Sequence, residues 1–347
     1  MEISKRDIEW AAAQGLISAA QVDPFWTALE NRAGSRARFD LPHIAYYFGA
    51  LVVMSAMGWL VTRAWERFGG AALLLIAIIY ALGFSLAGHR LWVRQRLRVP
   101  GGLLFTLAVW MTPLGIYGFQ RMTGIWLQQD PGAYRNYYEW VKGGWFFMEV
   151  GTILAGLVVL WFVRFPFLTF PVAFALWFMS MDLTPLIYGR LDFTWNQRSW
   201  VSLWFGLAFL GLAFLVDRRT RDDYACWGYL FGALAFWGGL SLMESESELG
   251  KLVYCLINVA LVLVSVLLDR RVFMVFGALG IFGYLGHLAY TVFKDSLLFP
   301  FALSALGLVV IWLGIKYQRN RASIEATIFS VVPAGLQRLM ARQRSGR

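Results

Sequence analysis

Four polar side chains lie inside long apolar stretches of this sequence: Glu149, Asp182, Asn258 and His287. A carboxyl or imidazole group in apolar surroundings is costly unless a proton, a counter-ion or water compensates its charge. Groups of this kind therefore often exchange protons or hold ions. We treat these four residues as candidates for binding a substrate or an ion.

The stretches that contain these residues have the length of membrane-crossing helices. The 347-residue chain is 59% hydrophobic and only 15% charged, which is more apolar than a soluble domain can bury. Apolar segments of about 17–25 residues predict an all-α, polytopic membrane protein with about ten transmembrane helices. We expect them near residues 43–62, 70–89, 101–120, 143–163, 165–188, 200–216, 224–243, 250–268, 272–293 and 297–317.

Within these boundaries the four polar side chains share one depth. At a rise of 1.5 Å per residue, each lies roughly 9–12 Å below the outer boundary, on four different helices. A layer of ionisable groups is typical of an ion or substrate route. A structural role stays open, because water near helix ends lowers the cost of a charge and Arg190 or Arg198 could satisfy the two acids.

Two Thr–Pro pairs occur near the outer ends of predicted helices. The stretch "TPLGIYG" covers residues 112–118, and "TPLIYG" covers residues 184–189. Proline removes a backbone hydrogen bond, so Thr112–Pro113 and Thr184–Pro185 are predicted helix breaks, the second beside Asp182.

A second repeated motif lies at the inner ends of two predicted helices. It reads "LVDRR" at 215–219 and "LLDRR" at 267–271. Both repeated motifs are compatible with repeated helical hairpins in parallel orientation. Chance matches in a biased composition explain them equally well.

The basic residues predict the orientation of the helices. If the N-terminus is cytoplasmic, most of the 31 Lys and Arg residues fall in inner segments, whereas the outer stretch "ESESELGK" is acidic. Positive charge is retained on the cytoplasmic side, so both termini are expected there. The net charge of +10 then indicates attraction to anionic lipids at the inner leaflet, and no nucleic-acid partner is expected.

The ends of the chain predict soluble segments around the transmembrane domain of residues 41–317. Residues 1–40 predict a cytoplasmic helical-hairpin module, in which Gly15 ends the first helix and Asp23–Pro24 provides the N-cap and first residue of the next. So small a hairpin buries little core, which makes it a candidate for binding a protein partner. Residues 318–347 predict a basic cytoplasmic tail that is partly an amphipathic helix, with an unstructured tail as the alternative.

Two stretches of the chain resemble a known group of proteins. They are "AAAQGLISAAQVDPFWTALE" near the start and "VFKDSLLFPFALSALGLVVIWLGIKYQRN" near the end. This pattern resembles bacterial predicted multi-pass membrane proteins of unknown function with a short N-terminal helical-hairpin domain. The resemblance implies a bacterial inner-membrane location and a soluble cytoplasmic module, and it supplies no catalytic residues.

No sequence motif predicts a metal centre, an organic cofactor or an enzyme active site. The chain lacks a Walker A loop, a dinucleotide fingerprint, a zinc-protease motif and a nucleophile elbow. The polar layer favours transport or permeation of a small solute, ion or lipid near the outer face. The alternative is an accessory, sensory or scaffold protein that recruits a partner through residues 1–40, and an intramembrane enzyme is the least favoured class.

Overall fold

The computed structural model describes residues 5–33, 41–125, 145–188, 194–220, 222–243, 247–292 and 298–319. Within these ranges every regular element is helical, so the predicted all-α class is confirmed. The chain divides into two compact units, Met1–Ala56 and Met57–Arg347. Arg190 and the predicted tail helix beyond residue 319 lie outside the described residues.

The first unit begins with a short helical hairpin, formed by α1 (Lys5–Ala13) and α2 (Val22–Ala33). Gly15 follows α1 with a φ of 72°, in the left-handed region that glycine adopts without strain. The 3₁₀ turn η1 (Ala19–Gln21) leads directly into α2. The prediction of Asp23 as the N-cap is therefore wrong: Asp23 lies in the first turn of α2, where its Oδ1 is 2.8 Å from the Lys5 Nζ.

Six helical segments of the described chain are long and apolar enough to cross a membrane. They are Gly70–Arg94, Arg98–Thr123, Pro166–Tyr188, Trp195–Arg219, Glu248–Leu268 and Arg271–Thr291. Two shorter apolar helices, Ile44–Trp59 within α3 (Leu41–Arg67) and α7 (Phe146–Phe162), accompany them. These lengths are those of an all-helical protein embedded in a membrane.

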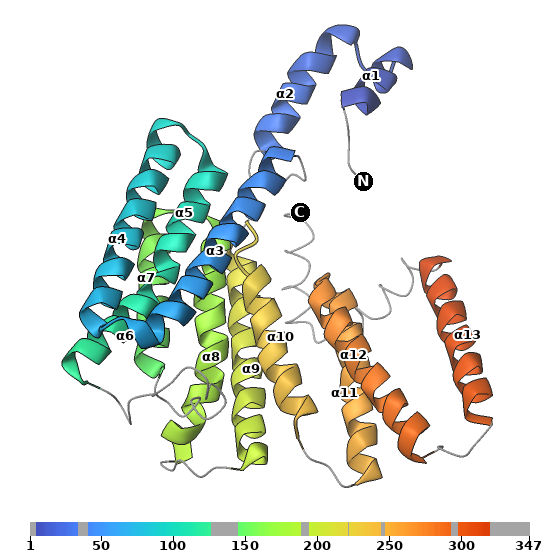
Figure 1. The fold of residues 1–347 in the computed structure, drawn as a ribbon. Helices are drawn as coiled ribbons and strands as arrows, with labels where there is room; N and C mark the ends of the chain where they lie inside the picture. Colours follow the sequence, from blue (N-terminus) through green and yellow to red (C-terminus); the bar gives the residue numbers. More distant parts are fainter. Residues whose placement is uncertain are drawn as a thin grey trace. The chain divides into compact units, whose positions relative to one another are not determined.

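The first half of the second unit is a bundle built around α7. Its further elements are α4 (Gly70–His89), the π-helical turn η2 (Arg90–Arg94), α5 (Arg98–Trp110), α6 (Thr112–Thr123), the 3₁₀ turn η4 (Pro166–Leu168) and α8 (Thr169–Tyr188). Helix α4 packs against α5 and α6, and α7 packs against α5, α6 and α8 (Figure 1). The start of α7 is thus packed against its neighbours, whereas Trp161 and Phe162 near its end are exposed.

The second half continues with two packed helix pairs. Its elements are α9 (Trp195–Arg219), α10 (Cys226–Ser241), α11 (Glu248–Leu268), α12 (Arg271–His287), the π-helical turn η5 (Leu288–Val292) and α13 (Leu298–Arg319). Helices α9 and α10 lie side by side, as do α11 and α12 (Figure 1). Helix α10 also contacts α8 and α12, and therefore links the two halves of the unit.

The two Thr–Pro pairs adopt different local structures. At Thr112–Pro113 one membrane-length segment is interrupted, because α5 ends at Trp110 and α6 begins at Thr112 with its proline in the first turn. Proline is well tolerated there, since first-turn amide groups have no helical acceptor. At Thr184–Pro185, α8 instead runs on to Tyr188 with the proline inside the helix.

Candidate functional site

Glu149 is a buried acid in the first turn of α7. Only 5% of its surface is exposed, and neither carboxylate oxygen has a hydrogen-bond partner among the described residues. The partial positive charge at the start of a helix offsets a negative charge there only in part. A buried carboxylate without a partner is rare, so this position points to a group that the protein acquires, a proton or a cation.

Asp182 approaches the same end of α7 from α8. It is 1% exposed, and its Oδ2 accepts a hydrogen bond from the backbone N–H of Trp145, the N-cap residue of α7, at 3.2 Å. One turn before Asp182, the Phe178 ring stacks on the Trp145 ring with 5.9 Å between the centroids. This packing of α8 on α7 brings Asp182 close enough to Glu149 for the two carboxyl groups to interact electrostatically.

Two more polar groups on the surrounding helices are buried without partners among the described residues. The Thr184 hydroxyl, two residues after Asp182 on α8, makes no hydrogen bond. The Trp110 indole N–H, at the end of α5, also makes none, although its ring packs on Phe170 and Phe174 of α8. These two groups lie apart along α8, because Trp110 packs near its start and Thr184 lies near its end.

Asn258 occupies a different part of the molecule and is fully satisfied. Its Nδ2 donates to the Tyr254 carbonyl oxygen at 2.9 Å, and its Oδ1 accepts from the Trp237 indole N–H at 3.1 Å. Helix α12 packs closely on it, because a Cβ at Gly280 would lie only 2.0 Å from the Asn258 Oδ1. These contacts make Asn258 a packing residue that joins α10, α11 and α12.

His287 ends α12 and contacts the start of α11. Its Nε2 lies 3.2 Å from the Glu248 Oε1, and the Lys251 Nζ contacts the same oxygen at 2.7 Å. The structure therefore brings Glu149 and Asp182 together at α7 and α8, whereas Asn258 and His287 have their partners on α10, α11 and α12. The four residues share a depth in the sequence-based prediction, but they are not one cluster of interacting side chains.

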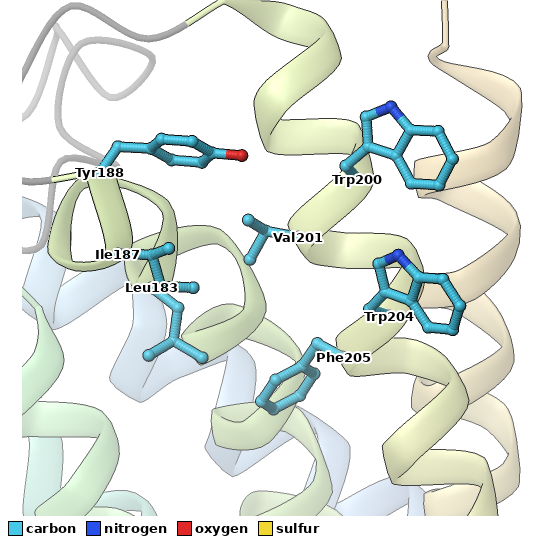
Figure 2. Close-up of a pocket in the computed structure, with 7 residues that line it drawn as sticks. All are labelled: Leu183, Ile187, Tyr188, Trp200, Val201, Trp204 and Phe205. Atoms are coloured by element: carbon cyan, nitrogen blue, oxygen red, sulfur yellow. The ribbon is translucent and has the colours of Figure 1, made fainter.

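An aromatic groove lies between α8 and α9, with a volume of about 460 Å³. It is lined by Leu183, Ile187, Tyr188, Trp200, Val201, Trp204 and Phe205 (Figure 2). Leu183 stands between Asp182 and Thr184 in the sequence, so α8 carries the acid and part of the groove on adjacent positions. The described lining residues are apolar or aromatic, which suits an apolar chain.

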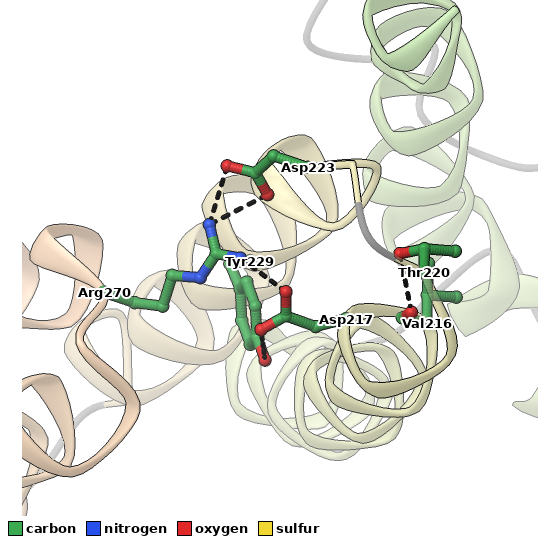
Figure 3. Close-up of polar contacts among 6 residues, drawn as sticks. All are labelled: Val216, Asp217, Thr220, Asp223, Tyr229 and Arg270. Atoms are coloured by element: carbon green, nitrogen blue, oxygen red, sulfur yellow. Dashed lines mark hydrogen bonds and ion pairs between the residues drawn. The ribbon is translucent and has the colours of Figure 1, made fainter. Parts of the chain in front are cut away.

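Sequence reasoning missed a charged cluster centred on Arg270. Its Nη2 contacts the Asp217 Oδ1 at 2.5 Å, and its Nη1 contacts the Asp223 Oδ2 at 2.8 Å (Figure 3). The Tyr229 hydroxyl donates to the Asp217 Oδ2 at 3.2 Å, and its ring lies 5.1 Å from the guanidinium. Burial lowers the pKa of Arg270, but its bonds to the two aspartates outweigh this and raise it above its ordinary value.

The signal for this cluster was present in the repeated "DRR" motif. Asp217 belongs to the first copy and Arg270 to the second, so the two copies meet in space. Their backbones differ, because α9 continues through Arg219, whereas Asp269 ends α11 with a φ of 53°. The motif therefore acts here as two complementary halves of one ion-pair cluster.

Comparison with protein family models, characterised proteins and solved structures finds no match to this chain. The resemblance to bacterial multi-pass proteins thus stays a prediction. The fold and the site define the class: an all-helical protein with several membrane-length apolar helices, in which two acidic side chains are buried together between α7 and α8.

Proposed function

We propose that this protein lies in the bacterial inner membrane and transports or conducts a proton or a small cation through the Glu149–Asp182 pair. The observation that carries this proposal is the buried, unpartnered carboxylate of Glu149 beside a second buried acid. Within a membrane, such a pair is stable only when a proton or a cation neutralises part of its charge. A group that must be neutralised reversibly is suited to ion exchange.

The predicted topology supports an ion route through this pair. When α3, α7, α10 and α13 are added to the six long apolar segments, the chain has about ten crossings, with both termini in the cytoplasm. Helix α7 then begins near the outer face, and its first turn places Glu149 within reach of outer water.

The test is ion flux in liposomes that contain the purified full-length chain. A pH-sensitive dye and a cation-sensitive dye are trapped inside, and a gradient of protons, Na⁺ or K⁺ is imposed. We expect flux with the unmodified chain and its loss in Glu149→Gln, which keeps the size of the side chain but cannot ionise. Asp182→Asn is expected to reduce flux as well.

The matched control is Glu248→Gln, which removes an exposed acid at the start of α11. This variant should keep the flux of the unmodified chain. Equal flux through Glu149→Gln and Glu248→Gln liposomes, with both proteins folded, would refute the proposed route.

A second candidate function is recruitment of a protein partner by the N-terminal unit. Three large apolar side chains of its α1–α2 hairpin are exposed: Trp10 by 62%, Leu16 by 71% and Phe25 by 52%. Exposed apolar residues gathered on a small hairpin are typical of a binding surface. If the hairpin recruits a partner, deletion of residues 1–38 should remove a co-purifying protein and leave liposome flux unchanged. The double substitution Trp10→Ser with Phe25→Ser should have the same two effects.

A further inference from the structure

The connection between α4 and α5 concentrates positive charge at the end of two membrane-length segments. Arg90 and Arg94 lie in η2, at the end of the segment Gly70–Arg94. Arg96 lies between the two segments, and Arg98 begins the segment Arg98–Thr123. All four residues are exposed. Because the connection is so short, these guanidinium groups are held at the depth where a membrane-crossing helix meets the lipid headgroups.

The backbone of this connection is folded into a defined turn. The Gln95 N–H donates to the Arg90 carbonyl oxygen at 3.3 Å, and the Leu97 N–H donates to the Leu91 carbonyl oxygen at 3.0 Å. Arg96 has a φ of 56°, a left-handed conformation that disfavours residues with a Cβ. A π-helical turn and a strained non-glycine residue in succession are common at functional positions.

An aromatic contact anchors the turn to the rest of the bundle. The Trp92 ring meets the ring of Phe165, which precedes η4, edge to face with 6.4 Å between the centroids. The Arg98 guanidinium lies 5.9 Å from the Trp92 ring centroid. The charged groups are therefore presented by a packed structure, and tryptophan at this depth is typical of the membrane interface.

No acid neutralises these arginines among the described residues. Within the described ranges, the one contact that any of the four makes through its charged group is that of Arg98 with the Trp92 ring. The sequence has no Asp or Glu between Glu66 and Asp130, so this part of the chain supplies no counter-ion. The α11–α12 connection differs, because its Arg270 is bound by two aspartates.

We propose that the α4–α5 turn, residues Arg90–Arg98, is a binding site for the phosphate groups of anionic phospholipids. A guanidinium group donates two parallel hydrogen bonds to a phosphate, and four such groups within nine residues can hold more than one phosphate oxygen at once. The headgroup layer supplies anionic phosphates at the depth of the turn. This inference rests on membrane embedding alone and is independent of the proposed ion route.

The experiment measures lipid binding to the full-length chain, purified in an uncharged maltoside detergent, by native mass spectrometry. Phosphatidylglycerol, phosphatidylcholine and inorganic phosphate are titrated separately. We expect phosphatidylglycerol to bind more tightly than phosphatidylcholine. Arg94→Gln with Arg98→Gln should weaken the binding of phosphatidylglycerol about thirtyfold, since each arginine near a membrane surface contributes a roughly fivefold preference for anionic lipid.

The matched control is Arg218→Gln with Arg219→Gln, which also removes two charges, at the end of α9 beside Asp217. It should change the affinity for phosphatidylglycerol less than twofold. Equal loss in both double variants, or equal affinity for the two lipids, would overturn the proposal. Displacement of phosphatidylglycerol by millimolar inorganic phosphate would also overturn it, in favour of a soluble ligand.

A further variant separates lipid binding from folding. Arg96→Gly removes a charge and also relieves the left-handed strain at this position. It should raise the midpoint of thermal unfolding while it weakens the binding of phosphatidylglycerol. A merely structural turn would show the first change without the second, and that result would refute the site.

Discussion

Buried polar residues of this protein differ in how their hydrogen-bonding groups are satisfied. Asn258 has partners for both its amide nitrogen and its oxygen, and Arg270 binds two aspartates. Glu149 has none among the described residues. This contrast separates residues whose bonds hold helices together from Glu149, whose buried carboxylate has no such bond among the described residues.

The first prediction at this scale concerns the contact between Asn258 and Gly280. Asn258→Ala should destabilise the protein by about 1–2 kcal/mol, because the Trp237 indole N–H loses its acceptor. Gly280→Ala should cost about 1–3 kcal/mol, because its Cβ overlaps the Asn258 side chain. Unfolding of detergent-purified protein in mixed micelles with sodium dodecyl sulfate measures both changes.

The double variant provides the control. With Asn258 shortened to Ala, the Cβ at position 280 has room, so the cost of Gly280→Ala should nearly vanish. Additive effects of the two substitutions would show that they do not act on one contact.

A second residue-scale prediction concerns Arg270. Arg270→Gln leaves Asp217, whose side chain is 8% exposed, without its cationic partner and should cost about 3 kcal/mol. Arg270→Lys should lower the free energy of unfolding by nearly as much, since one ammonium group cannot replace a guanidinium whose two Nη atoms bind two aspartates. The same unfolding assay applies. The exposed neighbour Arg271→Gln serves as the control and should change stability by less than about 0.5 kcal/mol.

At the scale of elements, α5 and α6 both lie against α4. Helices α4 and α6 approach closely at Gly118, where a Cβ would lie 2.5 Å from the Leu74 backbone nitrogen and 2.9 Å from the Gly70 oxygen. Small residues permit such contact between membrane helices, where packing drives association. The "TPLGIYG" stretch thus contains a proline in the first turn of α6 and a glycine where α6 contacts α4.

This packing predicts different responses at two glycines of α6. Gly118→Ala should destabilise the protein by about 1–3 kcal/mol, because backbone atoms of α4 cannot move aside easily. Gly115→Ala is the matched control, because its Cβ would make only ordinary contact, 3.5 Å from the Ala77 Cβ, and helix propensity favours alanine. Similar unfolding midpoints for the two variants would contradict the close approach of α4 and α6.

At the scale of the whole molecule, the distribution of charge predicts how the chain is oriented in a membrane. The basic turn from Arg90 to Arg98 carries no acid, and Asp23 in the N-terminal unit is paired with Lys5. Positive charge near short connections keeps them on the cytoplasmic side, so the α4–α5 turn and the N-terminus are expected to face the same compartment.

Labelling by a membrane-impermeant maleimide tests this orientation. In a background with Cys226 and Cys255 replaced by Ser, Thr123→Cys should react from outside intact spheroplasts. Gln14→Cys and Gln95→Cys should react only after the membrane is permeabilised. Labelling of Gln95→Cys in intact cells would reverse the proposed topology.

The sequence by itself determined the all-helical class and the approximate positions of many helices. Apolar stretches of membrane length are a local property, and α4, α8, α9 and α11 begin and end within five residues of the predicted limits. The polar residues within them were visible for the same reason. The predicted number of about ten crossings remains to be measured, because several helices are shorter or less apolar than the six described above.

Only the tertiary structure decided which polar residues meet and which copy of a repeated motif breaks its helix. Thr112–Pro113 interrupts a helix and Thr184–Pro185 does not, although their local sequences are alike. Pro113 lies in the first turn of α6, where no helical hydrogen bond is lost, whereas Pro185 lies inside α8 and leaves one carbonyl oxygen without its helical donor. The pairing of Glu149 with Asp182 likewise depends on α7 lying against α8, a contact between helices that no local pattern specifies.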